Sequence, residues 1–171
     1  MKNRTLVLLS AALLLSGCAQ PPPPTPSGVS GQSASLNGLT LSVQAPTRSY
    51  TTGQTAPLTI TALNTTHRDM TILAPDGALA YVALVRKTRL GPETLKRYPQ
   101  SSLQVRTPWV LPAGKSREFR MEMTIGPDWP TGEPLSLRAE LNGVPGLQAG
   151  LTIIVQPAAP AAPAPAATQP K

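Results

Sequence analysis

Few residues of this 171-residue chain have side chains suited to catalysis or metal binding. His67 is its single histidine and Cys18 its single cysteine, so neither a multi-histidine metal site nor an intramolecular disulfide can form from this chain alone. Asp69 is close enough in sequence to orient His67, but no Gly-x-Ser-x-Gly motif supplies a hydrolase nucleophile. We therefore expect His67 to be a solvated turn residue, and we expect no enzyme, no metal site and no cofactor.

A phosphate-binding loop is also excluded. Gly114-Lys115-Ser116 matches the end of that motif, but the motif needs glycine at position 109, where this chain has Trp109. The eight acidic residues are scattered and show neither the alternating spacing of a calcium loop nor a pair that points to a glycosidase. An envelope hydrolase therefore remains only as the weakest alternative.

Cationic side chains gather in one segment. They are opposed within that segment only by Glu93, and the five cations are Arg86, Lys87, Arg89, Lys96 and Arg97. Because guanidinium and ammonium groups bind phosphate and carboxylate, we expect the connection 86–100 to contact anionic headgroups, wall polymers or an acidic partner. The alternative is a solvated loop that keeps an edge strand soluble.

Trp129 is the second candidate for partner binding. It lies between Asp128 and Pro130 in an expected turn, where an exposed indole would be a good contact residue. The alternative is that it packs half-buried under a loop. Trp109, which precedes Val110 and Leu111, is expected in the core.

The N-terminus has the features of a secretory signal. Lys2 and Arg4 precede a ten-residue apolar run, Leu6–Leu15, which is too short to span a bilayer as a helix. The following string, Leu15-Ser16-Gly17-Cys18, resembles the lipobox of bacterial lipoproteins. The resemblance implies removal of residues 1–17 and acylation of Cys18, which would hold the chain on membrane lipid; the alternative is an ordinary secretory signal with an incidental cysteine.

The residue after the cysteine and the remaining charge refine this expectation. Ala19 follows Cys18, which by the enterobacterial sorting rule implies the outer membrane, facing the periplasm; another leaflet or the cell surface stays open. Without residues 1–17 the chain keeps 13 cationic and 8 acidic side chains. This excess suits anionic lipids or wall polymers, whereas an exported chain would rarely meet nucleic acid.

Two Pro-rich arms are expected to be disordered. Residues 18–35 combine the acylated Cys18 with a Pro-, Ser- and Gly-rich linker, and residues 156–171 form a Pro/Ala-rich tail. Neither composition can build a core. We expect plain spacers, with wall threading or groove docking of the tail as the alternative.

Residues 36–155 show the alternation of half-buried strands. Leu39, Leu41 and Val43 alternate with polar residues, as do the apolar residues of 58–62, 119–125 and 135–141. Leu79–Val85 is apolar on both faces, as in a central strand. Turn signals at Gly53, Gly77, Gly114, Gly132 and Gly143 separate these runs. The pattern predicts an all-β protein, an immunoglobulin-like antiparallel β-sandwich of seven to eight strands.

Several short sequence features of roughly residues 39–155 occur in an order that resembles a known protein family. The features are Thr59–Thr66, Asp76-Gly77, Leu79–Val85, Arg97-Tyr98, Leu111–Phe119 and Pro130-Thr131-Gly132 before Leu135–Leu141. Together they resemble the BsuPI-type intracellular proteinase inhibitor domain. That resemblance implies an immunoglobulin-like fold and, as one hypothesis, proteinase inhibition.

These observations favour one function over two alternatives. We expect a membrane-anchored cell-envelope lipoprotein whose β-sandwich is a non-enzymatic protein-binding or structural module, with an envelope protein or wall component as partner. A BsuPI-type proteinase inhibitor is the first alternative, and an envelope hydrolase is the second.

Overall fold

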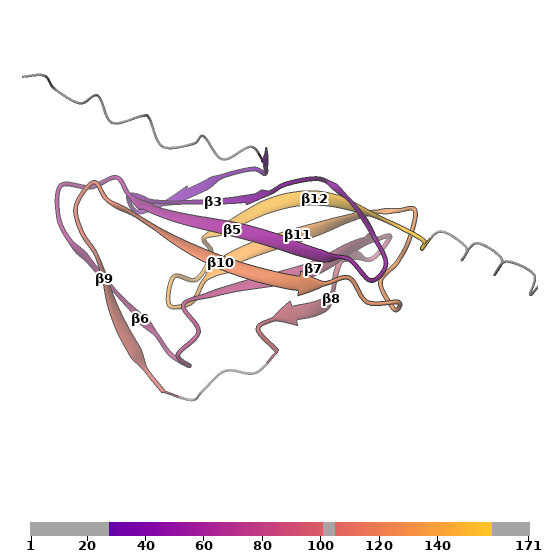
Figure 1. The fold of residues 1–171 in the computed structure, drawn as a ribbon. Helices are drawn as coiled ribbons and strands as arrows, with labels where there is room; N and C mark the ends of the chain where they lie inside the picture. Colours follow the sequence, from indigo (N-terminus) through magenta and orange to yellow (C-terminus); the bar gives the residue numbers. More distant parts are fainter. Residues whose placement is uncertain (1–27, 101–104, 159–171) are drawn as a thin grey trace, which may run out of the picture.

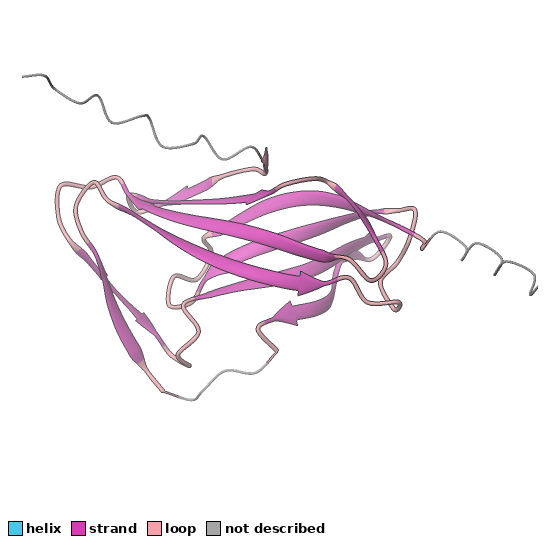
Figure 2. Ribbon diagram, viewed as in Figure 1, coloured by secondary structure: helices cyan, strands magenta, loops and turns pink. Residues whose placement is uncertain are grey.

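The computed structural model describes residues 28–100 and 105–158, and within them the protein is an all-β sandwich (Figures 1 and 2). One sheet contains β1 (Val29–Ser30), β2 (Ala34–Leu36), β3 (Leu39–Ala45), β5 (Thr55–Asn64) and β10 (Ser116–Thr124). The other contains β4 (Ser49–Thr51), β12 (Gln148–Gln156), β11 (Pro134–Leu141), β7 (Ala80–Thr88) and β8 (Gly91–Tyr98). A separate ribbon pairs β6 (Met70–Ala74) with β9 (Thr107–Leu111). The described residues contain no helix long and apolar enough to cross a membrane.

The core lies between the two five-stranded sheets. Alternating residues of the facing strands are fully buried, among them Leu41, Ile60, Leu84, Leu137 and Ile153. Because side chains of a strand point alternately to its two faces, this burial is the direct consequence of the apolar alternation in the sequence. The central order β3–β5–β10 against β12–β11–β7–β8 is that of an immunoglobulin-like sandwich.

The number of strands differs from the sequence-based expectation. The described residues form twelve strands rather than seven or eight, because five strands of two to five residues lie beside seven longer ones. Strand β8 was expected to be a polar connection. Its residues, Gly91–Tyr98, carry no apolar alternation because β8 is the outermost strand of its sheet and packs little of its surface against the core.

The sandwich also begins before residue 36. Val29 and Ser30 pair with the end of β3, Ala34–Leu36 pair with its start, and between them Gln32 pairs with Gly150 of β12. The segment therefore joins both sheets at one edge. Gly31 permits this contact, because a Cβ at that position would lie 2.2 Å from the Gly150 carbonyl oxygen. The part of the predicted linker from Gly28 to residue 35 thus belongs to the folded unit, and Cys18 lies outside the described residues.

The β5–β10 ladder turns a corner into the β6–β9 ribbon, which projects from one end of the sandwich (Figure 1). Asn64, at the end of β5, is the one buried polar residue among those described. Its side-chain amide donates to the carbonyls of Arg68, Leu111 and Pro112 at 2.8, 3.0 and 3.2 Å. Its carbonyl oxygen accepts from the backbone N–H and the hydroxyl of Thr66 at 2.9 and 2.7 Å. These bonds pair backbone groups of the connection after β5 and of the end of β9, which the strand ladders do not pair at the corner.

Candidate functional site

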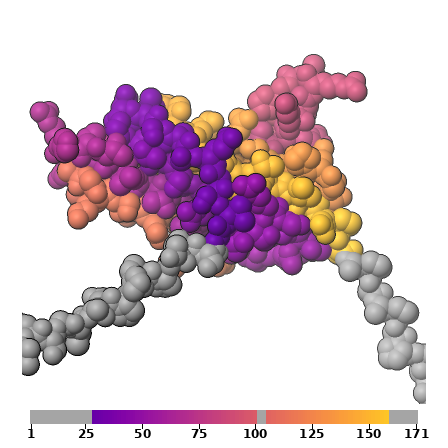
Figure 3. Space-filling model, turned by 90° about the horizontal axis from the view of Figure 1, so that it is seen from above, coloured from indigo at the N-terminus to yellow at the C-terminus, as the bar shows by residue number. Residues whose placement is uncertain are grey.

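The cationic segment forms a β-hairpin rather than the predicted loop. Strands β7 and β8 are joined by the two-residue turn Arg89-Leu90, and this hairpin projects from the body of the protein (Figure 3). The turn is braced, since the Thr88 hydroxyl donates to the Gly91 carbonyl at 2.7 Å and accepts from the Leu90 N–H at 3.3 Å. We call residues 87–91 the hairpin tip.

Alternation along the two strands divides the five predicted cations between opposite faces of the hairpin. Arg86 and Lys96 lie on the same face of the hairpin as the buried Leu84. Arg86 is two residues from Leu84 on β7, and Lys96 is the residue of β8 that pairs with Leu84. Lys87 and Arg97 lie on the outer face, and Arg89 lies in the turn. The five side chains therefore do not form one continuous surface.

Arg86 is held in an ion-pair network. Its guanidinium lies 2.8 Å from a carboxylate oxygen of Glu93 on the adjacent strand and 3.9 Å from Glu133, which precedes β11. The hydrogen bond to Glu93, together with the negative charges of both carboxylates, raises the pKa of Arg86. With two acidic partners, this guanidinium is poorly placed to bind another anion.

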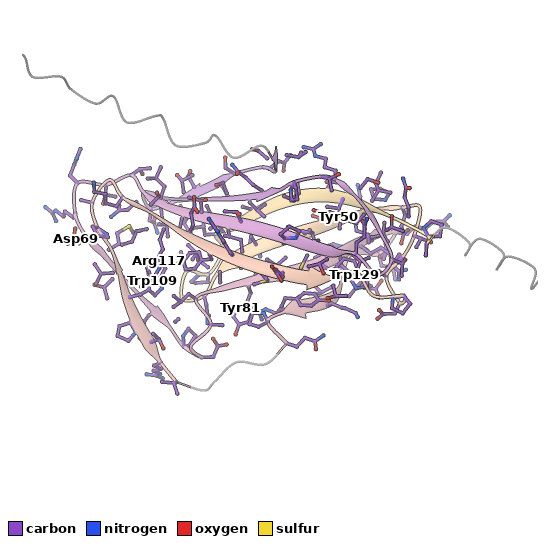
Figure 4. The ribbon with its side chains drawn as sticks, in the orientation of Figure 1. Tyr50, Asp69, Tyr81, Trp109, Arg117 and Trp129 are labelled. Carbon is purple, nitrogen blue, oxygen red and sulfur yellow. The ribbon has the colours of Figure 1, made fainter. Side chains whose placement is uncertain are left out.

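Lys96 and Trp129 lie together on the core-side face of the hairpin. The Lys96 ammonium is 2.7 Å from the Asp128 carboxylate. The adjacent Trp129 is only 2% exposed and packs against Tyr98, with the ring centroids 6.4 Å apart (Figure 4). The expectation that Trp129 is an exposed contact residue is therefore wrong. The 126–133 connection folds it beneath the hairpin, where burial of a large aromatic surface is favourable.

The Lys96–Asp128 pair gives the protein a pH-dependent contact. The hydrogen bond to Lys96 lowers the pKa of Asp128, and the same bond raises the pKa of Lys96. Because the pKa of Asp128 is lower in the folded protein than in the unfolded chain, its ionised carboxylate stabilises the fold at pH values above the unfolded-state pKa. This stabilisation is lost as the pH falls through the folded-state pKa. Because the pKa of Lys96 is higher in the folded protein than in the unfolded chain, its ammonium group stabilises the fold at pH values below the unfolded-state pKa. This stabilisation is lost as the pH rises through the folded-state pKa.

We expect Asp128→Asn to lower the free energy of unfolding by an amount that is constant near neutral pH, begins to shrink below about pH 4, where an aspartate of the unfolded chain becomes protonated, and is lost as pH falls through the lower pKa of the folded state. Urea unfolding of both proteins across this range checks the prediction. Glu122→Gln is the matched control, because Glu122 is exposed and forms no ion pair with the residues described. An Asp128→Asn deficit that persists unchanged at pH 2 would contradict the assignment.

Arg97 lies on the outer face in a second network. Its guanidinium carbon is 4.0 Å from the centre of the Tyr81 ring, and one of its nitrogens is 3.4 Å from the Glu140 carboxylate. The Tyr81 hydroxyl donates to the Asp76 carboxylate, which also accepts from Asn142. Arg97 therefore covers Tyr81 and links β8 to β11, while 54% of its side chain stays exposed.

The hairpin tip differs from the rest of the hairpin. Among the residues described, the side chains of Lys87 and Arg89 form no ion pair and no hydrogen bond. Leu90, which follows Arg89 in the turn, is fully exposed, at 102% of its reference area. Leu90 is not among the residues predicted to bind a partner, because a leucine in a polar segment gives no sign that it lies in a two-residue turn.

The remaining candidates for chemistry stay apart. His67 is exposed in the connection between β5 and β6, and the Asp69 carboxylate instead accepts from the Ala113 N–H at 2.9 Å. In the described ranges, no three His, Cys, Asp or Glu side chains are grouped as they would be around a metal ion. Trp109, in strand β9 of the ribbon, is buried, as predicted, and lies beside Arg117 (Figure 4).

No protein-family model and no curated protein matches this chain. Among solved structures, the sporulation control protein Spo0M from Bacillus subtilis matches 71% of this chain and 50% of its own, at 14% identity and a TM-score of 0.49. A β-glucosidase from Listeria innocua matches 72% of this chain and 16% of its own, at 13% identity and a TM-score of 0.44. The alkylpurine DNA glycosylase AlkC from Pseudomonas fluorescens matches 66% of this chain and 28% of its own, at 16% identity and a TM-score of 0.43. This chain spans half or less of each of these proteins.

Proposed function

We propose that this protein is a membrane-anchored cell-envelope lipoprotein. The observation that carries the proposal is the string Leu15-Ser16-Gly17-Cys18 at the end of a short basic-then-apolar segment. Acyl chains on Cys18 provide stable attachment without a membrane-spanning helix, since two or more chains bind a bilayer far more strongly than one. Ala19 favours the outer membrane facing the periplasm.

The folded unit stays close to that membrane. Gly28, where the described structure begins, is ten positions after Cys18. A chain of that length spans at most about 35 Å even when fully extended. A sandwich held at this distance meets partners of the envelope at a high effective concentration.

We further propose that the sandwich is a non-enzymatic module that binds an envelope protein or a wall component through the hairpin tip. Arg86, Lys96 and Arg97 are engaged in ion pairs, whereas Arg89 and Leu90 project together. An exposed apolar side chain beside an unpaired guanidinium suits a partner that offers an apolar pocket rimmed by acidic groups.

The test is crosslinking in intact envelopes followed by capture of the protein. We expect the double variant Arg89→Glu/Leu90→Asp to lose a crosslinked partner that the unmodified protein retains, because it reverses the charge and removes the apolar contact. Arg68→Glu/Leu73→Asp is the matched control, since both positions are exposed and lie at the opposite end of the sandwich. Identical partners for all three proteins would contradict binding through the tip.

A proteinase inhibitor of the BsuPI type is the second candidate. The braced hairpin tip favours it, since a protease cleft binds a projecting loop of fixed conformation with little loss of entropy. Assays of the purified protein against a panel of serine proteases test this candidate. Absence of inhibition at micromolar protein would remove it and leave the binding-module proposal intact.

A further inference from the structure

A hollow of about 450 Å³ lies on the outer face of the β4–β12–β11–β7–β8 sheet, beside the projecting hairpin. Val85, Ser136 and Thr152 are among its lining residues, and Lys87 and Arg138 line it as well. The hollow includes Lys87, Thr88 and Gly91 of the hairpin tip, but it does not include the turn residues Arg89 and Leu90, on which the proposed partner binding depends.

Strand register explains how these residues come together. Ser136 of β11 pairs with Val85 of β7 on one side and with Thr152 of β12 on the other, so the three form one row across the sheet. Lys87 is two residues along β7 from this row, and Arg138 is two residues along β11 in the opposite direction. At about 3.4 Å per residue, the Cα atom of each of these two residues is about 7 Å from the row, with Lys87 on one side of it and Arg138 on the other.

The two cations have no acidic partner in the described part of the chain. The nearby carboxylates are engaged elsewhere: Glu93 and Glu133 face Arg86, and Glu140 contacts Arg97 and accepts from Gln148. Lys87 and Arg138 themselves form no ion pair or hydrogen bond with the described residues. Arg138 is partly buried as a residue, and no carboxylate of the described residues neutralises it, so its guanidinium is free to bind an anion.

The donors in this hollow suit a phosphate group. A guanidinium offers forked hydrogen bonds, an ammonium adds a second positive charge, and the hydroxyls of Ser136 and Thr152 are further donors. A phosphate monoester carries about two negative charges and three terminal oxygens at neutral pH. We propose that the hollow binds a phosphate group, with Arg138 and Lys87 contacting its oxygens from opposite sides of the row.

Titration calorimetry of the purified full chain with inorganic phosphate and with glycerol 3-phosphate, at constant ionic strength, tests the proposal. We expect saturable binding that weakens at least tenfold in Arg138→Gln and in Lys87→Gln, because each variant removes one charge-assisted contact. Arg89→Gln is the matched control: it removes an equal charge two residues from Lys87 but outside the hollow, and it should bind as the unmodified protein does.

Flotation of the Cys18→Ser chain, which carries no acyl group, with phosphatidylcholine vesicles separates the two sources of such a group when the vesicles are prepared with and without phosphatidic acid, a lipid phosphate monoester. Binding of the free phosphates alone identifies a soluble phosphorylated ligand, and Arg138-dependent flotation with the anionic vesicles identifies a lipid headgroup. Circular dichroism melting of each variant verifies that it is folded. Absence of binding to every probe, or equal weakening in Arg89→Gln and Arg138→Gln, would overturn the proposal.

Discussion

Asn64→Ala is expected to lower the free energy of unfolding by about 3 kcal/mol or more. The substitution removes five hydrogen bonds at the corner between the sandwich and the ribbon. Each buried backbone group left without a partner costs roughly 1–3 kcal/mol. Because the carbonyls involved belong to both arms of the corner, we expect the β6–β9 ribbon to detach before the sheets unfold.

Urea unfolding monitored by tryptophan fluorescence measures this effect, since Trp109 lies on the ribbon and Trp129 lies near the hairpin. Thr66→Val is the matched control, because it removes only the hydroxyl contacts with Asn64 and Arg68. It should cost about 1 kcal/mol. Equal losses in the two variants would show that Asn64 does not hold the corner.

Gly143→Ala is the second substitution expected to have a large effect, again about 3 kcal/mol or more. Gly143 has a φ of +91°, which non-glycine residues rarely adopt. A Cβ there would lie 2.2 Å from the Leu73 carbonyl oxygen. The β11–β12 connection and strand β6 would have to separate, in addition to the cost of the backbone conformation itself.

Gly146→Ala distinguishes the two contributions. Gly146 has a similar φ of +85°, but nothing lies within 4 Å of a Cβ built on it. This variant should therefore lose only about 1 kcal/mol, the cost of the backbone conformation. Thermal and urea unfolding of both variants check the difference; a Gly143→Ala protein as stable as Gly146→Ala would contradict the close approach to β6.

Apart from β8, the long strands could be predicted from their apolar residues, which in most of them alternate against a core on one face. Leu79–Val85 was recognisable as a central strand, and the expected turns at Gly53, Gly77, Gly114, Gly132 and Gly143 all have positive φ. Strands β1, β2 and β4, of two or three residues each, could not be found in this way. Strand β4 has three residues, and the pairing of Gln32 with Gly150 joins positions far apart in the sequence.

The candidate site was predictable in composition but not in arrangement. The sequence shows a cluster of cations, yet which of them are neutralised depends on contacts such as those of Lys96 with Asp128 and Arg97 with Glu140. These partners come from other strands or connections. Arg138 was overlooked for the converse reason, since a single arginine in an alternating strand shows nothing of the hollow that β7 and β12 form around it.

The mass of the mature N-terminal peptide tests the central claim most directly, because attachment through Cys18 determines where the sandwich works. We expect the protein from membrane fractions to begin at Cys18 and to carry a thioether-linked diacylglycerol, and we expect Cys18→Ser to be recovered without lipid and detached from membranes. A mature chain with an unmodified thiol at Cys18, isolated from a water-soluble fraction, would contradict the account.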